Sequence, residues 1–207
     1  MSPLAKAIST KTGTAPRRAT KRAPDAIGLL KADHRSVETL FKNFERTGAR
    51  AHTTRRKLVD RMITDLSVHA FIEEQVLYPA AKEKIAAAKV DVLEALEEHH
   101  VVKWQLQELI DLDPTDERFT AKVTVLTKHV RHHVKQEERE LFPLLRSGFD
   151  RALLLELGTE LQQAKRVAPH HPHPRLPVHP AELALPKAVT SVLDRAKDAV
   201  KSVGAGS

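Results

Sequence analysis

The chain contains no cysteine. It therefore has no disulfide bond, no cysteine-based zinc site and no iron–sulfur cluster, and any metal it binds must be held by histidine, aspartate or glutamate. Glycine is also scarce, with seven in 207 residues, and aromatic residues make up only 4% of the chain. Alanine and leucine are common and no alternating β-branched pattern is present, so the composition favours helices over sheets.

Long apolar runs are missing too. No stretch approaches the roughly 20 residues that a membrane-spanning helix needs, and the start of the chain lacks the apolar segment of a signal peptide. We therefore expect a cytoplasmic protein. The sequence contains no phosphate-binding loop, no Ser/His/Asp set and no suitable nucleophile, which disfavours a hydrolase, including one that depends on zinc or manganese.

The net charge of +7 is unevenly distributed along the chain. Residues 1–24 are rich in Ser, Thr, Pro, Lys and Arg and contain no acid, which predicts a disordered basic arm. The simpler interpretation of this arm is a solubilising tail. The alternative is an arm that binds nucleic acid or another anionic surface, although no aromatic residue is interleaved with the basic ones for base stacking.

The other end of the chain also differs from the middle. Prolines and histidines from residue 168 onward predict an extended linker, and residues 186–203 predict an amphipathic helix. The apolar side of that helix is mostly Ala and Val, which suits docking on protein better than insertion into a membrane. The expected domains are thus a basic arm (1–24), a helical domain (25–167), and a Pro/His-rich linker with a terminal helix (168–207).

In the middle region, apolar residues recur every three or four positions, as is typical of amphipathic helices. We expect helices over residues 25–48, 54–88, 90–112, 116–146 and 150–167. The second should be capped by Thr53 or Thr54 and bent at Pro79, and the fifth should pack on the outside of the others. Four long helices joined by short loops predict an all-α protein, an up-down-up-down four-helix bundle.

Two of the expected helices repeat one motif. The first copy is His69-Ala70-Phe71-Ile72-Glu73-Glu74, closed by Leu77-Tyr78-Pro79, and the second is His133-Val134-Lys135-Gln136-Glu137-Glu138, closed by Leu141-Phe142-Pro143. Residues i and i+4 project from the same face of a helix, so each copy points an imidazole and a carboxylate in one direction. A single His-x-x-x-Glu pair is common by chance on charged helices, whereas two copies with matching apolar flanks indicate a duplicated half-site.

The first and third helices share a second motif, acid-His-x-x-Val. It reads Asp33-His34-Arg35-Ser36-Val37 in one and Glu98-His99-His100-Val101-Val102 in the other. This register makes His99 the inward-facing histidine, with His100 as the alternative, since adjacent helical residues differ by about 100° in direction. Each of the four bundle helices then contributes one histidine to the core.

Four histidines and two glutamates in a bundle core have a chemical consequence. Buried carboxylates without partners are unfavourable and repel each other, and the arrangement becomes favourable when dications replace protons. Six ligands shared by two metals, with both glutamates bridging, leave positions open for solvent or a small molecule. Nitrogen and oxygen ligands suit iron, manganese or zinc, and mixed His/carboxylate bundle sites favour a redox-active pair, as in di-iron carboxylate proteins.

The order His, His-x-x-x-Glu, His, His-x-x-x-Glu on four successive helices resembles that of hemerythrin-like domains, also called HHE cation-binding domains. The resemblance covers about residues 25–147. It implies two non-heme iron ions and a reaction with dioxygen, hydrogen peroxide or nitric oxide. The terminal iron ligands it implies are His34, His69, His99 and His133, and the bridging ligands are Glu73 and Glu137.

One departure concerns the third helix, which in oxygen-carrying hemerythrins supplies two histidines one turn apart. Here Lys103 follows His99 at that spacing, and Trp104 follows His100. The candidate substitute for the missing fifth histidine is His129, one turn before the histidine of the fourth helix. The departure argues against a dedicated reversible oxygen carrier and leaves oxygen sensing, catalase-like peroxide or nitric oxide chemistry, or iron handling.

Several neighbouring residues have simpler interpretations. Glu74 and Glu138 are solvated or orient ligands through hydrogen bonds. Tyr78 could approach a metal, but packing in the core is the simpler interpretation, because its counterpart in the second copy is Phe142. The alternative function is a metal-independent helical scaffold that binds nucleic acid or acidic partners through its basic tails, with binding that depends strongly on salt.

Overall fold

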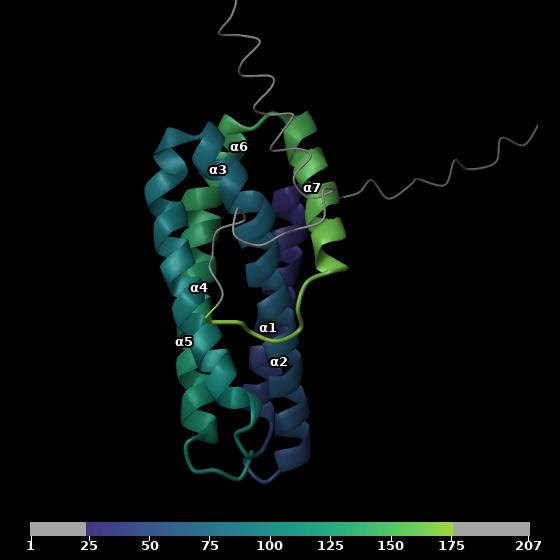
Figure 1. The fold of residues 1–207 in the computed structure, drawn as a ribbon. Coiled ribbons are helices and arrows are strands. Elements are labelled where there is room, and N and C mark those ends of the chain that lie inside the picture. Colours follow the sequence, from purple (N-terminus) through teal and green to yellow (C-terminus); the bar gives the residue numbers. More distant parts are fainter. Residues whose placement is uncertain (1–23, 176–207) are drawn as a thin grey trace, which may run out of the picture.

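The computed structural model describes residues 24–175, and these are all-helical with no strand (Figure 1). The long helices are α1 (Ala26–Arg46), α2 (His52–Ile72), α4 (Lys89–Ile110), α5 (Phe119–Gln136) and α7 (Arg151–Lys165). The short elements are η1 (Glu73–Leu77), α3 (Tyr78–Lys84), η2 (Ala86–Ala88), η3 (Glu137–Leu141) and α6 (Phe142–Gly148). The predicted basic arm and terminal amphipathic helix lie outside the described residues.

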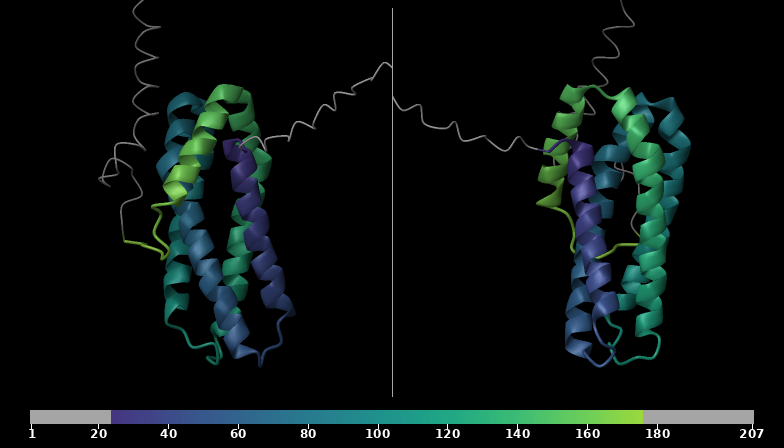
Figure 2. Two further views of the ribbon diagram at one scale, coloured as in Figure 1. Left: turned by 90° about the vertical axis from the view of Figure 1, so that its right-hand side faces the viewer. Right: turned by 180° about the vertical axis from the view of Figure 1, so that it is seen from behind.

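The four bundle helices run alternately up and down along one axis, with the α1–α2 and α4–α5 loops at the same end (Figures 1 and 2). Helix α1 packs on α2, α4 packs on α5, and α2 also contacts α4. The predicted all-α bundle is therefore confirmed. Among the described residues, no helix is both long and apolar enough to cross a lipid bilayer.

Two predicted helix starts are wrong. Helix α2 begins at His52 with Ala51 at its N-cap and no side-chain cap, because a turn closed by the bond from Ala51 N to Gly48 O starts the helix before the threonines. Helix α5 begins at Phe119, since Asp116 holds a turn instead, its Oδ1 accepting a hydrogen bond of 2.7 Å from the Arg118 backbone. The start of α1 is as expected, with Asp25 as N-cap accepting from Gly28 N at 2.7 Å.

The expected bend at Pro79 takes the form of a π-helical turn. The N–H of Tyr78 bonds to Glu73 O, five residues back, and Phe142 N–H bonds to Glu137 O in the same way. A proline has no N–H and crowds the carbonyl four residues earlier, which accounts for a wider turn just before it. Both π turns begin at the glutamate of a His-x-x-x-Glu motif. Helix α3 then ends at Lys84, short of the predicted end near residue 88.

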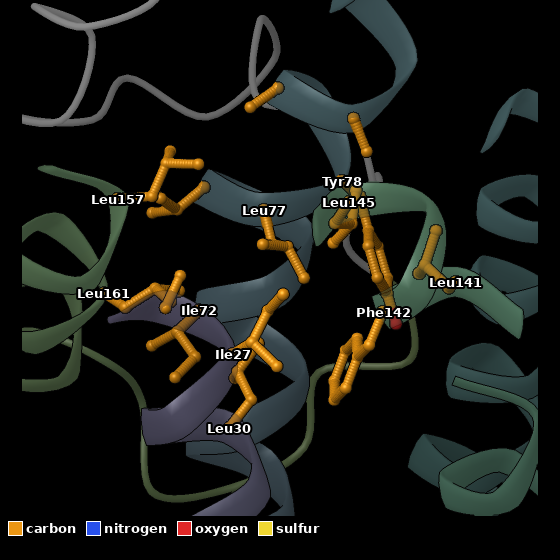
Figure 3. Packing of buried hydrophobic residues seen from close by; sticks show 14 of the residues in the cluster. Ile27, Leu30, Ile72, Leu77, Tyr78, Leu141, Phe142, Leu145, Leu157 and Leu161 are labelled. Atoms are coloured by element: carbon orange, nitrogen blue, oxygen red, sulfur yellow. The ribbon is translucent and has the colours of Figure 1, made fainter. Parts of the chain in front are cut away.

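The apolar core consists of two clusters. The end cluster lies near the start of α1 and contains Ile27, Leu30, Ile72, Leu77, Tyr78, Leu141, Phe142, Leu145, Leu157 and Leu161, whose side chains gather between the helices in Figure 3. The loop cluster lies toward the α1–α2 loop and contains Val37, Phe41, Phe44, Val59, Met62, Leu66, Val102, Leu106, Leu109, Phe119, Val123, Leu126 and Val130. On α1, His34 falls between Leu30 of one cluster and Val37 of the other. A polar layer therefore lies between two apolar ones.

Helix α7 packs against the outside of the four bundle helices, as expected, and its inner face joins the apolar core. It packs on α1, α2 and η1, and Leu157 and Leu161 are almost fully buried in the end cluster. The approach is close because Gly158 faces the start of α1: a Cβ at that position would lie 2.7 Å from the Pro24 carbonyl oxygen. The leucine spacing of α7 places one apolar stripe against the bundle and so closes its end.

Candidate metal centre

Six polar side chains meet in the layer between the two clusters. They are His34 from α1, His69 from α2, Glu73 from η1, His99 from α4, His133 from α5 and Glu137 from η3, and each is at most 5% exposed. The histidines form two pairs: the Nε2 atoms of the α1 and α2 histidines are 3.2 Å apart, and those of the α4 and α5 histidines are 3.0 Å apart. Two imidazole nitrogens at this spacing can bind a single metal ion.

Each glutamate connects the two histidine pairs. Glu73 Oε2 lies 3.2 Å from His69 Nε2 and 3.5 Å from His99 Nε2. Glu137 Oε2 lies 3.3 Å from His34 Nε2 and 3.5 Å from His133 Nε2. Two groups of candidate ligand atoms result, one with His34, His69 and both glutamates, the other with His99, His133 and Glu73. Glu73 belongs to both groups, so it lies between the two histidine pairs.

A second ring of carboxylates faces the outer nitrogens of the histidines. His34 Nδ1 lies 2.9 Å from Glu138 Oε1, and His99 Nδ1 lies 3.0 Å from Glu74 Oε1. An ionised carboxylate only accepts hydrogen bonds, so each Nδ1–H is the donor and the Nε2 lone pair faces the centre. The sequence allows Glu74 to be either solvated or orienting a ligand through a hydrogen bond. Because Glu74 is buried against His99, the structure favours the second interpretation.

Only one of the remaining two histidines has the same arrangement. His133 Nδ1 lies 2.7 Å from Glu98 Oε2. His69 Nδ1 lies 3.7 Å from Asp33 Oδ2, beyond hydrogen-bond distance, and has no hydrogen-bond partner. Asp33 and Glu98 are the acids of the repeated acid-His-x-x-Val motif. The duplication in the sequence thus reappears as a near-twofold relation between the α1–α2 half and the α4–α5 half. Each half places one outer carboxylate beside a histidine of the other half and one beside a histidine of its own.

Tyr78 breaks this twofold relation. Its hydroxyl donates a hydrogen bond of 2.9 Å to Glu137 Oε1 and lies 3.4 Å from His99 Nε2. Its counterpart Phe142 stacks on His34 with 5.7 Å between ring centroids and has no polar atom to donate. The packing interpretation of Tyr78 is therefore incomplete, because its ring is buried in the core while its hydroxyl reaches the centre. The signal in the sequence was the Tyr/Phe difference between two otherwise matching motifs.

A family model, the hemerythrin HHE cation binding domain, matches residues 25–145. The chain belongs to this family. The crystal structure of a hemerythrin HHE cation binding domain-containing protein from Mycobacterium kansasii is similar in fold, with a TM-score of 0.59 and 23% identity, over 70% of this chain and 89% of that one. A curated relative named DNA nickase, from Nostoc sp. strain PCC 7120, is 27% identical over 137 residues. That match covers 66% of this chain but only 38% of the nickase.

The charge balance of the HHE domain fits a cation at the centre. Both carboxylate oxygens of Glu73 and Oε2 of Glu137 are buried without a hydrogen-bond partner. Burial, and then the nearby Glu137 charge, raise the pKa of Glu73 well above its ordinary value. Burial also raises the pKa of Glu137, but the adjacent His133 and His34 lower it by more. The two carboxylates thus lie close to four imidazole nitrogens, and three of their oxygens lack a hydrogen-bond donor. A divalent cation bound by these oxygens and nitrogens would compensate the buried negative charge.

The histidines of the HHE domain have nitrogen lone pairs available for a metal. Burial lowers the pKa of His69 to about 4 and also lowers that of His99, so both are neutral at physiological pH. Burial opposes protonation of His133 as well, but the charges of Glu137 and Glu98 raise its pKa. A metal at His133 would compete with a proton for the same nitrogen, so its binding should depend on pH.

The two alternative histidines lie away from the centre. His100 is half-buried on the side of α4 and its Nε2 accepts a hydrogen bond of 3.2 Å from the Trp104 indole. His129 is exposed, 2.9 Å from the Gln105 amide, and does not replace the missing fifth histidine, because Val130 occupies the inward position. Where that fifth histidine would stand, Lys103 instead donates to Glu74 at 2.6 Å.

A small cavity adjoins the histidines on the side of the loop cluster. It has a volume of about 20 Å³, room for one water-sized molecule. All four site histidines line it, and its other walls are Val37, Leu66, Ala70, Val102, Val130 and Val134. A neutral molecule of two or three atoms fits this cavity, whereas its apolar walls disfavour an ion.

Proposed function

We propose that this HHE domain binds two iron ions in the polar layer of the bundle. The four histidines would be terminal ligands, two to each ion, and Glu73 and Glu137 would bridge the ions. The observation that carries the proposal concerns Oε2 of Glu73 and Oε2 of Glu137. Each is buried with no hydrogen-bond partner, and each lies within 3.5 Å of histidine nitrogens from two different helices. Such groups are unfavourable in the core unless a cation neutralises them.

The chemistry of the ligand set favours iron over the alternatives. Imidazole and carboxylate without thiolate suit iron, manganese or zinc, and bridged pairs in helical bundles are typical of di-iron proteins. Bound iron would supply one-electron redox chemistry toward dioxygen, hydrogen peroxide or nitric oxide. The protein's own contribution is to orient the imidazoles through the outer carboxylates, to hold Glu137 through Tyr78, and to exclude bulk water from the apolar cavity.

We propose turnover or sensing rather than oxygen transport. Lys103 stands where oxygen carriers have a further histidine, and it is paired with Glu74. A site with fewer histidines leaves more positions for exogenous ligands, which suits reaction with peroxide or nitric oxide better than stable storage of dioxygen. The same proposal includes a cytoplasmic location and, as a further possibility of the same site, a role in iron handling.

The test is to add hydrogen peroxide, and separately nitric oxide, to the iron-loaded protein while following its optical spectrum and gas release. Steady oxygen evolution from peroxide supports a catalase-like activity, and a stable coloured adduct with nitric oxide supports binding or sensing. The matched control is the Glu73→Ala/Glu137→Ala double variant. Equal reactivity of the control, or an iron-loaded protein inert to both molecules, would contradict the proposal.

A second candidate function is binding of nucleic acid through the basic arm. Two observations favour it: residues 1–24 contain basic residues and no acid, and a relative of the domain is named DNA nickase. The nickase activity belongs to that longer protein, of which this chain matches 38%. The test compares duplex DNA binding by the full chain and by a variant lacking residues 1–23, at several salt concentrations. Loss of salt-dependent binding on deletion supports this function, and unchanged binding contradicts it.

A further inference from the structure

A groove between α1 and α5 opens on the surface beside the metal centre. Its volume is about 430 Å³, within the roughly 300–1,000 Å³ of ordinary small-molecule sites. Helices α1 and α5 make far fewer contacts with each other than α1 makes with α2, so the groove follows from their sparse packing. Its lining residues are His34, Arg35, Val37, Glu38, Phe41, Val130, Arg131, Val134, Lys135, Glu138 and Arg139.

The floor of the groove is apolar. Val37, Phe41 and Val130 are at most 4% exposed, and Val134 completes the surface between them. Val37, Val130, Val134 and His34 also line the small cavity beside the site histidines, so the floor lies between the groove and the centre. An occupant of the groove would thus lie against the outer side of the His34–Glu138 hydrogen bond.

The rim of the groove has a surplus of positive charge. Its two acids are already paired: Glu38 accepts from Arg131 at 2.9 Å, and Glu138 contacts His34 and Lys31. The other rim cations, Arg35, Lys135 and Arg139, are exposed and have no carboxylate partner in the described part of the chain. Three uncompensated cations around an apolar floor are complementary to a molecule with one anionic end and one apolar end.

We propose that the α1–α5 groove binds a single-chain amphiphilic carboxylate of the fatty-acid type. The aliphatic chain lies along Val37, Phe41, Val130 and Val134, and the carboxylate lies between Arg35, Lys135 and Arg139. The volume suits one short aliphatic chain rather than a two-chain lipid. The apolar floor distinguishes this ligand class from nucleic acid, whose phosphates need cations but no apolar surface. This groove adjoins the metal centre and shares His34 with it, but the proposed carboxylate contacts Arg35, Lys135 and Arg139, none of which is a candidate metal ligand.

The test is calorimetric titration of the full chain, as purified, with decanoate below its micelle concentration. The expected result is saturable binding with one decanoate per chain. Octanoate and hexanoate should bind progressively more weakly, by about fourfold for each methylene lost from the floor. The neutral analogue decanol should bind at least tenfold more weakly than decanoate. Absence of saturable binding, or equal affinity for decanol, would overturn the proposal.

Two matched variants locate the site. Lys135→Gln/Arg139→Gln should weaken decanoate binding about tenfold, whereas Lys57→Gln/Lys128→Gln should leave it within twofold. The control pair makes the same charge change at exposed lysines on α2 and α5 that do not line the groove. An equal loss in both variants would show a general charge effect and overturn the site.

Two further probes distinguish other anionic partners of the same cations. Phosphatidylglycerol vesicles and a short duplex DNA are each tested against the full chain and the Lys135→Gln/Arg139→Gln variant. Any binding of vesicles or DNA should be the same for the full chain and for this variant. If the variant loses binding to vesicles or DNA, and decanoate gives no binding heat with the full chain, the rim cations contact a membrane surface or nucleic acid. The fatty-acid proposal would then be wrong.

Discussion

Tyr78 donates a hydrogen bond of 2.9 Å to Glu137, at a position where the matching residue of the other half has no polar group. That counterpart, Phe142, stacks on the His34 ring, whereas the Tyr78 ring is tilted against His99. One bridging carboxylate therefore has a donor, while both oxygens of the other, Glu73, have none. The near-twofold site is thus chemically asymmetric, and its two halves should respond differently to substitution.

Removal of the hydroxyl in Tyr78→Phe should destabilise the metal-free protein. The ring remains in the end cluster, but Glu137 Oε1 loses its donor in a buried site. A hydrogen bond to a charged group contributes about 1.5–3 kcal/mol, so the free energy of unfolding should fall by about that amount. Urea denaturation of the chelator-treated protein measures it. An unchanged free energy of unfolding would mean that Glu137 does not depend on Tyr78.

Replacement of the two glutamates by glutamine should have opposite effects on the metal-free protein. The pKa of Glu73 is raised above its ordinary value of 4.5, so the folded state loses stability as the pH rises above that value. Glu73→Gln removes this loss and should be more stable than the parent at about pH 7, by about 1.4 kcal/mol for each unit of the pKa shift.

Glu137→Gln should be less stable than the parent at the same pH. The pKa of Glu137 is lowered by His133 and His34 in spite of burial, so its carboxylate stabilises the fold above pH 4.5, and this stabilisation is lost as the pH falls through the folded pKa. Urea denaturation of both variants from about pH 5 to about pH 7 gives the comparison. Two variants shifted in the same direction would contradict the assigned asymmetry.

The outer carboxylates should matter for metal affinity. Glu98→Gln and Glu138→Gln each change the hydrogen-bond acceptor of a histidine Nδ1, and loss of such a partner typically lowers metal affinity about 10–100-fold. The matched control is Glu140→Gln, on the same turn as Glu138 but exposed. Competition with a chromophoric chelator measures the affinities. The role assigned to these carboxylates fails if all three variants bind metal equally well.

The docking of α7 can be tested at a glycine. In Gly158→Ala the new methyl would meet backbone atoms of Pro24, Asp25 and Ala26 at 2.7–3.0 Å, and backbone cannot move aside as a side chain can. The free energy of unfolding should fall by about 1–3 kcal/mol. Gly48→Ala is the control, because a Cβ there meets nothing within 4 Å, and its effect should be neutral or slightly stabilising. Equal behaviour of the two variants would mean that α7 is not held tightly against α1.

The bundle was predictable because its information is local. Apolar residues at helical spacing define each helix, and the repeated His-x-x-x-Glu motif indicates which faces meet. The acid-His-x-x-Val register pointed to His99 rather than His100, and the structure buries His99 at 3% exposure while His100 stays half-buried beside Trp104. The duplication supplied the comparison that a single helix does not offer.

Features that depend on contacts between distant segments were not predictable. Element η1 buries five consecutive residues, Glu73 to Leu77, whereas η3, with the same π turn, buries only Glu137 and Leu141. The difference follows from tertiary packing, since α7 packs on η1 and Glu74 contacts His99 and Lys103 of α4. These contacts bury Glu74, although the sequence allowed a solvated position. The docking of α7 depends on the fit of Gly158 to a backbone more than 100 residues earlier, and nothing in the spacing of α7 indicates that fit.

Elemental analysis of the purified protein measures whether the six side chains of the polar layer bind two iron ions. We expect about two iron ions per chain in the parent protein and none in Glu73→Ala/Glu137→Ala, with both proteins helical by circular dichroism. A parent protein that folds but takes up no iron, or a double variant that retains iron, would mean that the polar layer is not a di-iron site.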